Sequence, residues 1–193
     1  MNGPWIQTYT GKAFPLLNPQ PGDVDLLDIA HALSNLCRFT GHTRSFYSVA
    51  QHSVLVSYAV PKEHALQALL HDAPEAYIGD LNRPTKHAVG LEAYREIEQR
   101  IWLAVAARFG VPDGLAPEVK DADNQLLFTE RRDLMGEEAE PWEGSVAPLR
   151  GHVVPLRPTK ARKRFLLRFF GLQGCDPLQA ESSMRALLKG GQR

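Results

Sequence analysis

Apolar side chains recur at three- and four-residue steps along most of the sequence, and this helical period constrains the fold more than any other feature. It predicts helices over residues 25–37, 46–58, 61–70, 75–78, 91–109, 117–134, 161–170 and 177–188. Strict alternation of apolar and polar residues, which marks a half-buried strand, is almost absent apart from a short stretch around Val153. The sequence therefore predicts an all-α fold.

The length of the chain, 193 residues, predicts a single domain, because a chain of this size can bury one sizeable core. Residues 1–24 combine four prolines with Trp5, Tyr9 and Phe14 and predict an irregular N-terminal arm with aromatic anchors. Residues 25–135 form the predicted helical core. Residues 136–193 are expected to add a surface excursion over 136–158 and two closing helices that pack on the same domain.

Charge and composition exclude several classes of protein. The 22 basic and 22 acidic residues cancel, which argues against the broad positive field that nonspecific nucleic-acid binding requires. Two cysteines do not make an extracellular disulfide framework. The N-terminus lacks a signal-peptide pattern, and no window approaches the roughly 20 apolar residues of a membrane span. We therefore expect a cytoplasmic protein that binds neither nucleic acid nor membranes.

The adjacent pair His71-Asp72 stands where a predicted apolar helix ends before Pro74. The pair offers two ligands for a cation at one helix terminus, although Asp72 is equally explained as the cap of the next helix. His52 lies on the preceding predicted helix, and Asp123 lies near the apolar face of a later one. Three helices can then converge on one ion.

Imidazole and carboxylate ligands suit manganese, iron, cobalt, nickel or zinc, and the absence of thiolates argues against a closed structural zinc site. Two histidines and two carboxylates also leave coordination positions open for water and substrate. The residues do not distinguish among these metals. A magnesium ion that accompanies a triphosphate substrate is a further option.

The ordered residues His52, His71-Asp72 and Asp123 resemble the H, HD, D signature of HD-domain phosphohydrolases. The stretch from His71 to Leu81 reads HDAPEAYIGDL and is followed by Pro84 and Lys86. It is similar to the subgroup that contains bacterial 5'-deoxynucleotidases and phage dATP triphosphohydrolases. The resemblance covers roughly residues 28–134 and implies a single HD-domain helical bundle with one divalent metal held by those four residues.

The resemblance also implies catalytic residues. Glu75, three residues after Asp72, matches the glutamate that orients or deprotonates the attacking water, and a carboxylate one helical turn from a ligand can reach that water. Alternatively, Glu75 is an ordinary first-turn acid favoured by the helix dipole. Asp80, after Gly79, matches a second acid beside the sugar and the scissile phosphate.

Four residues are candidates for binding the substrate. Arg38 matches an arginine that grips phosphate through bidentate contacts, although a helix C-terminal arginine that complements the dipole is the alternative. Phe39 stands where the deoxynucleotidases have tryptophan, so the selection of deoxyribose by that ring does not carry over. Lys86 and His42 could contact phosphate, and solvent exposure explains His42 equally well.

The function implied by the resemblance is divalent-metal-dependent hydrolysis of (deoxy)nucleotides, with 5'-deoxynucleotidase-like release of phosphate favoured. The alternatives are a dNTP triphosphohydrolase that releases triphosphate, and a non-catalytic regulatory module that binds metal or nucleotide. Only His87 lies between the HD pair and Asp123, where dinuclear members need further histidines, and this favours one metal. The resemblance also implies a homo-oligomer, with the helix over residues 91–109 as a candidate interface.

Overall fold

The structure, a computed structural model, describes residues 3–138, 140–142, 144 and 146–190. These residues are mostly helical, as predicted. The elements are β1 (Trp5–Gln7), β2 (Ala13–Pro15), η1 (Pro21–Asp23), α1 (Leu26–Asn35), η2 (Arg38–Gly41), α2 (Val49–Ala59), η3 (Lys62–His64), α3 (Ala65–Leu70), α4 (Glu75–Ile78), α5 (Arg83–Lys86), α6 (Glu92–Phe109), α7 (Pro117–Leu134), α8 (Pro158–Leu172) and α9 (Pro177–Gly190).

Helix ends follow local backbone chemistry. Pro117 occupies the first turn of α7, where its missing N–H costs nothing. Gly110 ends α6 with a left-handed φ of 69°, which a glycine adopts without strain. Ser48 caps α2 because its side chain accepts a hydrogen bond from the N–H of Gln51. The predicted bounds of α4 and α7 are therefore confirmed, and those of α6 differ by one residue at the start.

Two local predictions are wrong. The arm was expected to be irregular, but β1 and β2 pair in an antiparallel hairpin with Ile6 opposite Phe14. Three-residue strands are too short to show an alternating pattern, so the sequence did not reveal them. The predicted loop 80–84 is interrupted by α5, which begins at Arg83 because the Asn82 side chain accepts from the N–H of Thr85.

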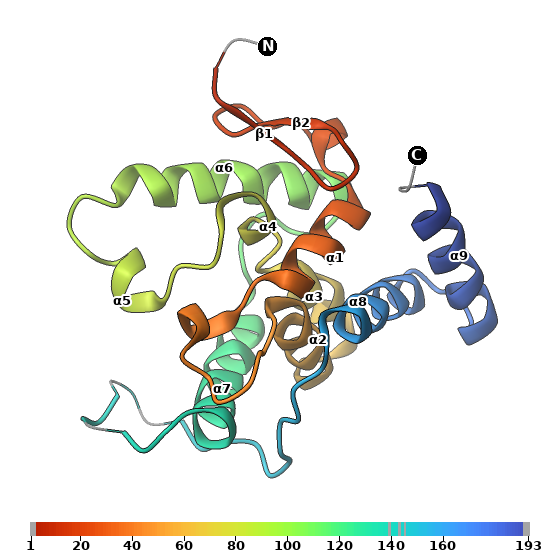
Figure 1. Cartoon of the computed structure of the whole chain (residues 1–193). Coiled ribbons are helices and arrows are strands. Elements are labelled where there is room, and N and C mark those ends of the chain that lie inside the picture. Colours follow the sequence, from red (N-terminus) through yellow and green to blue (C-terminus); the bar gives the residue numbers. More distant parts are fainter. Residues whose placement is uncertain (1–2, 139, 143, 145, 191–193) are drawn as a thin grey trace.

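The core surrounds α2, which packs against α1, α3, α7 and α8 (Figure 1). Large side chains such as Leu33, Leu69, Phe165 and Leu166 are fully buried in it. Because α2 is covered on several sides, His52 in its first turn is 0% exposed. Within the described ranges, no helix is both long enough and apolar enough to cross a membrane.

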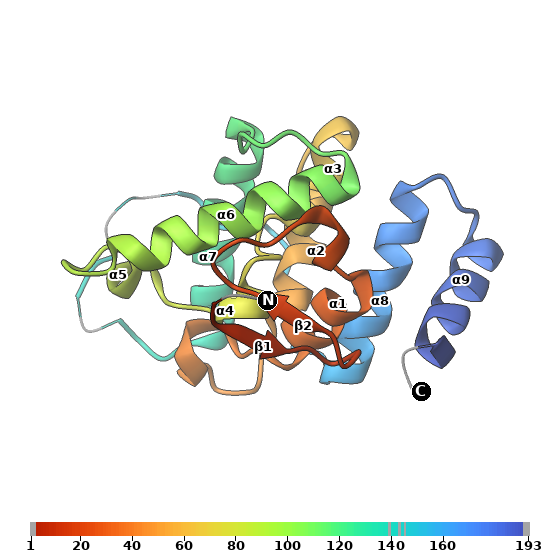
Figure 2. The same cartoon turned by 90° about the horizontal axis from the view of Figure 1, so that it is seen from above.

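The N-terminal hairpin and the C-terminal helices cover different parts of this core. Figure 2 shows β1 and β2 lying over α1 and α4, whereas α9 packs on α8 at one side of the molecule. Phe14 of the hairpin stacks on Tyr77 of α4 with ring centroids 3.7 Å apart. The described part of 136–157 is largely exposed and contains no helix or strand. Residues 1–2, 139, 143, 145 and 191–193 of the predicted segments lie outside the described residues.

Candidate metal centre

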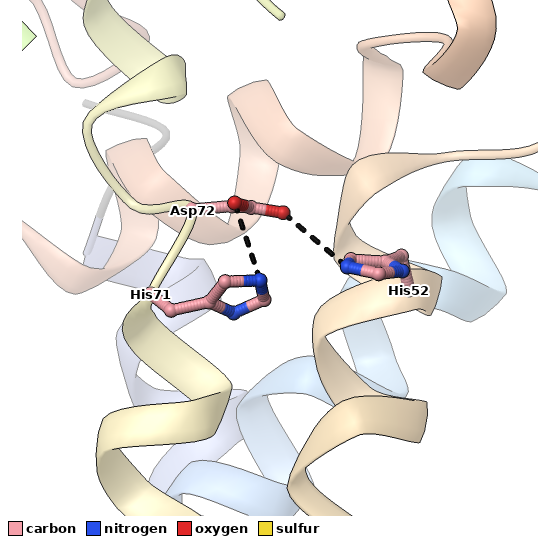
Figure 3. Close-up of side chains that lie close together, drawn as sticks. All are labelled: His52, His71 and Asp72. Atoms are coloured by element: carbon pink, nitrogen blue, oxygen red, sulfur yellow. Dashed lines mark ion pairs between the residues drawn. The ribbon is translucent and has the colours of Figure 1, made fainter. Parts of the chain in front are cut away.

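His52, His71 and Asp72 come together at the end of α3 (Figure 3). The Asp72 carboxylate lies between the two rings, with Oδ1 3.2 Å from His71 Nε2 and Oδ2 3.6 Å from His52 Nε2. One ligand atom from each residue lies within 4.8 Å of the others, so the three could hold a metal ion. Three of the four predicted ligands are therefore assembled.

The interruption of the helix before Pro74 determines where His71 and Asp72 lie. Helix α3 ends at Leu70, and α4 begins at Glu75 after Pro74, which has no N–H to donate. The N–H of Glu75 donates to the backbone carbonyl of Asp72 at 3.0 Å, and no side chain caps α4. The carboxylate of Asp72 is therefore free to face His52 and His71, and its interpretation as a helix cap is wrong.

Asp123 approaches the group from α7. Its Oδ1 lies 3.1 Å from His52 Nε2, but it is not within the 4.8 Å group that the other three residues form. Arg83 also reaches Asp123, with Nη2 3.6 Å from Oδ2. The fourth predicted ligand, Asp123, thus contacts His52 and lies next to the group of three.

The hydrogen bonds of both histidines fit metal ligation. His71 Nδ1 lies 2.8 Å from the carbonyl oxygen of Ala68, and His52 Nδ1 lies 2.7 Å from Glu130 Oε1. These contacts leave the Nε2 atoms facing the group. Among the described residues, His52 Nε2, His71 Nε2 and Asp72 Oδ2 are buried without a hydrogen-bond partner. Such orphaned groups are rare in folded proteins, and a divalent cation would satisfy all three.

The charges of the group favour a cation. Burial and Arg38 oppose the charged form of His52, but Glu130 and Asp123 outweigh them and raise the pKa of His52 to about 10. Burial likewise opposes ionisation of Asp72, yet His71, His52 and Arg38 lower its pKa below the usual value. The Asp72 carboxylate is therefore ionised at neutral pH, and a cation that binds His52 competes with a proton.

The sequence analysis missed Glu130, which is 0% exposed. Its Oε1 accepts a hydrogen bond from the hydroxyl of Tyr47 at 2.7 Å in addition to its contact with His52, and its Oε2 lies 3.2 Å from Arg38 Nε. Glu130 follows Asp123 by seven residues, two turns along the same face of α7. That spacing was the only signal in the sequence.

The predicted catalytic acids lie near the metal group. Glu75 is 3% exposed, and burial, reinforced by Asp72 and Asp80, raises its pKa well above the usual value. Its Oε1 accepts from Lys86 Nζ at 2.8 Å. Burial also raises the pKa of Asp80, and the charge of Asp72 adds to the effect. Lys86 donates to Glu98 as well, at 2.8 Å, and its contact with phosphate stays a prediction.

The predicted substrate-binding residues are divided between buried and exposed positions. Arg38 Nη1 lies 3.6 Å from Asp72 Oδ2, and α1 ends at Asn35, so Arg38 does not complement that helix end as the alternative supposed. Phe39 is half-buried, with the Arg38 guanidinium carbon 5.3 Å from its ring centroid. His42 is exposed, and no hydrogen bond or ion pair of its side chain to another described residue is found.

Comparison of the sequence with known proteins shows the family to which this chain belongs. No protein-family model matches the chain. The uncharacterized protein YfdR of Escherichia coli strain K12 is 42% identical over 168 residues, which cover 86% of this chain and 93% of YfdR. The chain belongs to the family of YfdR. The uncharacterized protein RCAP_rcc00048 of Rhodobacter capsulatus is 37% identical over 176 residues, covering 82% and 89%. Neither name states an activity, so the function of this YfdR-family chain is argued from its site.

Proposed function

We propose that this chain is a divalent-metal-dependent phosphohydrolase of the HD-domain type that acts on nucleotides, with 5'-deoxynucleotidase-like release of phosphate. The observation that carries the proposal is the set of orphaned, buried atoms on His52, His71 and Asp72, with Asp123 beside them. The ordered H, HD, D residues of the sequence support the same conclusion.

The donor set fits a transition metal such as cobalt, manganese, zinc, iron or nickel, because it combines imidazole nitrogen with carboxylate oxygen and contains no thiolate. When bound, a divalent cation supplies Lewis-acid activation of water and of the phosphoryl oxygens. His71 and Asp72 would hold it from the turn after α3, His52 from α2, and Asp123 from α7.

The other residues divide the remaining work. Water attacks the phosphorus and loses a proton, the bond between phosphorus and the sugar oxygen breaks, that oxygen takes up a proton, and a nucleoside and phosphate leave. Glu75 accepts the proton of the water, since its buried carboxylate stands three residues after the ligand Asp72. Arg38 stays charged and offers its guanidinium to the phosphate oxygens. Asp80 lies beside the sugar in this proposal.

The test is turnover by metal-reconstituted protein with a panel of deoxy- and ribonucleotides, as monophosphates and triphosphates. Phosphate and triphosphate are measured separately, because their identity distinguishes a nucleotidase from a triphosphohydrolase. Asp72→Asn and Glu75→Gln should abolish turnover, and Glu118→Gln, an exposed change at the start of α7, should not. If the protein binds nucleotide but shows no turnover with any metal, the proposed enzyme is wrong and the alternative, a non-catalytic regulatory module, is favoured.

A further inference from the structure

Glu130 occupies a position that the proposed reaction does not explain. It lies in α7, two helical turns after Asp123, and its side chain is completely buried. An ionised carboxylate at such a site is costly unless every oxygen faces a donor or a cation. Both oxygens of Glu130 meet that condition, because Oε1 faces His52 and the hydroxyl of Tyr47 and Oε2 faces Arg38. The carboxylate is therefore charged.

One oxygen of Glu130 contacts a candidate metal ligand. Oε1 lies 2.7 Å from His52 Nδ1 and accepts a hydrogen bond from the hydroxyl of Tyr47 at 2.7 Å. Burial, with the charge of Glu130, raises the pKa of Tyr47 well above its usual value, so this hydroxyl keeps its proton. Because the ionised carboxylate can only accept, His52 Nδ1 carries a proton and Nε2 is the nitrogen that faces Asp72 and Asp123.

The second oxygen of Glu130 faces the arginine assigned to phosphate. Oε2 lies 3.2 Å from Arg38 Nε, while Arg38 Nη1 lies 3.6 Å from Asp72 Oδ2. Neither Arg38 Nε nor Glu130 Oε2 has a hydrogen-bond partner among the described residues, so charge alone holds this pair. Arg38 thus retains donors for an incoming anion, and its position depends on Glu130.

We propose that Glu130 is a positioning residue that sets His52 for metal and Arg38 for phosphate through the two oxygens of one carboxylate. The proposal rests on the metal and phosphate sites of the proposed function, and not on turnover. A glutamine at this position has nearly the same shape but presents an N–H₂ group to at least one donor. It would disturb either the proton on His52 Nδ1 or the contact with Arg38.

The experiment measures Zn²⁺ affinity and then inorganic phosphate affinity of the zinc-loaded protein. It compares wild type with Glu130→Gln and with Glu118→Gln, the same chemical change on the exposed end of α7. Glu130→Gln should lower Zn²⁺ affinity by about 10- to 100-fold, as loss of a partner to a ligating histidine does, and should also weaken phosphate binding. Glu118→Gln should change neither affinity.

A measurement on the wild type keeps the proposal testable if Glu130→Gln does not fold. A ¹H–¹⁵N spectrum of the histidine rings in zinc-loaded protein should show His52 protonated at Nδ1. Tyr47→Phe removes one donor but keeps the carboxylate, so it should weaken Zn²⁺ binding less than Glu130→Gln does.

The outcomes separate this proposal from the proposed function. A wild type that fails to bind Zn²⁺ would overturn both. Zinc binding by the wild type that Glu130→Gln leaves unchanged, or a His52 ring protonated at Nε2, would overturn the role of Glu130 alone. A loss of Zn²⁺ affinity with phosphate affinity unchanged would overturn the shared role. Absence of turnover in a wild type that binds Zn²⁺ and phosphate, with both affinities weakened in Glu130→Gln, would contradict the hydrolase and leave the role of Glu130 as proposed.

Discussion

Removal of the Arg38 guanidinium should strongly destabilise the metal-free protein. The Arg38 side chain is 11% exposed and lies between Glu130, at 3.2 Å, and Asp72, at 3.6 Å. Arg38→Met keeps the unbranched stem but removes the positive charge that faces both carboxylates. His52 remains as the only other cation in contact with both among the described residues. One imidazolium would then face two buried carboxylates and Asp123.

The distances set the size of the effect. At an effective dielectric constant of about 20, ion pairs at these separations attract by about 5 kcal/mol each. The variant no longer has to desolvate the guanidinium, which offsets part of that loss, and breaking a buried pair typically costs about 3–5 kcal/mol. For a chain of 193 residues this corresponds to a fall in Tm of roughly 6–20 °C.

Urea unfolding at neutral pH in the presence of a chelator measures this loss. Arg44→Met is the matched control, because Arg44 is exposed and lies six residues further along the chain. A loss below about 1 kcal/mol, the value typical of an exposed pair, would refute the reasoning that Arg38 neutralises buried carboxylates. The double variant with Glu130→Gln should be less destabilised than the sum of the two single variants, because the two side chains are in contact.

Three further measurements test the centre and the fold. Zn²⁺ at 100 times its Kd should stabilise the wild type by about 2.7 kcal/mol in thermal unfolding, and should stabilise Asp72→Ala much less. Phe165→Ala should lower the free energy of unfolding by about 3–5 kcal/mol in urea, because Phe165 is fully buried in the core. The pKa of Asp133 is lowered chiefly by its hydrogen bond from Arg132 and also by the N–H of Val153, so its stabilising contribution is present above the ordinary aspartate pKa of 3.8 and is lost as pH falls below it. Urea midpoints measured from neutral to acidic pH should therefore fall less steeply in Asp133→Asn.

The helices and the HD pair could be predicted because their signals are local. Pro117 and the apolar residues Val119, Ala122 and Leu126 define α7, and the structure has the predicted bounds. Pro74 cannot continue the helix that precedes it, so the sequence places His71-Asp72 at the end of that helix. Convergence on His52 and Asp123 was a hypothesis about tertiary packing, and the short distances to His52 support it.

The role of Glu130 could not be predicted in the same way. Its spacing from Asp123 places both residues on one face of α7, but helical spacing does not say which helix that face meets. The packing of α2 against α7 decides that the carboxylate meets His52. The alternative interpretation of Arg38 as a helix C-terminal arginine that complements the dipole failed for a related reason, because α1 ends three residues earlier than Arg38.

The backbone directly after Arg38 adopts a left-handed conformation. Phe39 and Thr40 have φ values of 54° and 52°, and a left-handed conformation costs a residue other than glycine roughly 1–2 kcal/mol. Three hydrogen bonds hold the turn: from the N–H of Arg38 to the carbonyl of Tyr47 at 2.9 Å, from the N–H of His42 to the carbonyl of Phe39 at 3.0 Å, and from Asn82 Nδ2 to Thr40 Oγ1 at 3.1 Å. Strained backbone persists only where surrounding structure over-determines it, and here the contacts include Tyr47, shortly before α2, and Asn82, directly before α5. This turn begins at Arg38, whose guanidinium lies beside Asp72 and Glu130 while Phe39 is half-buried.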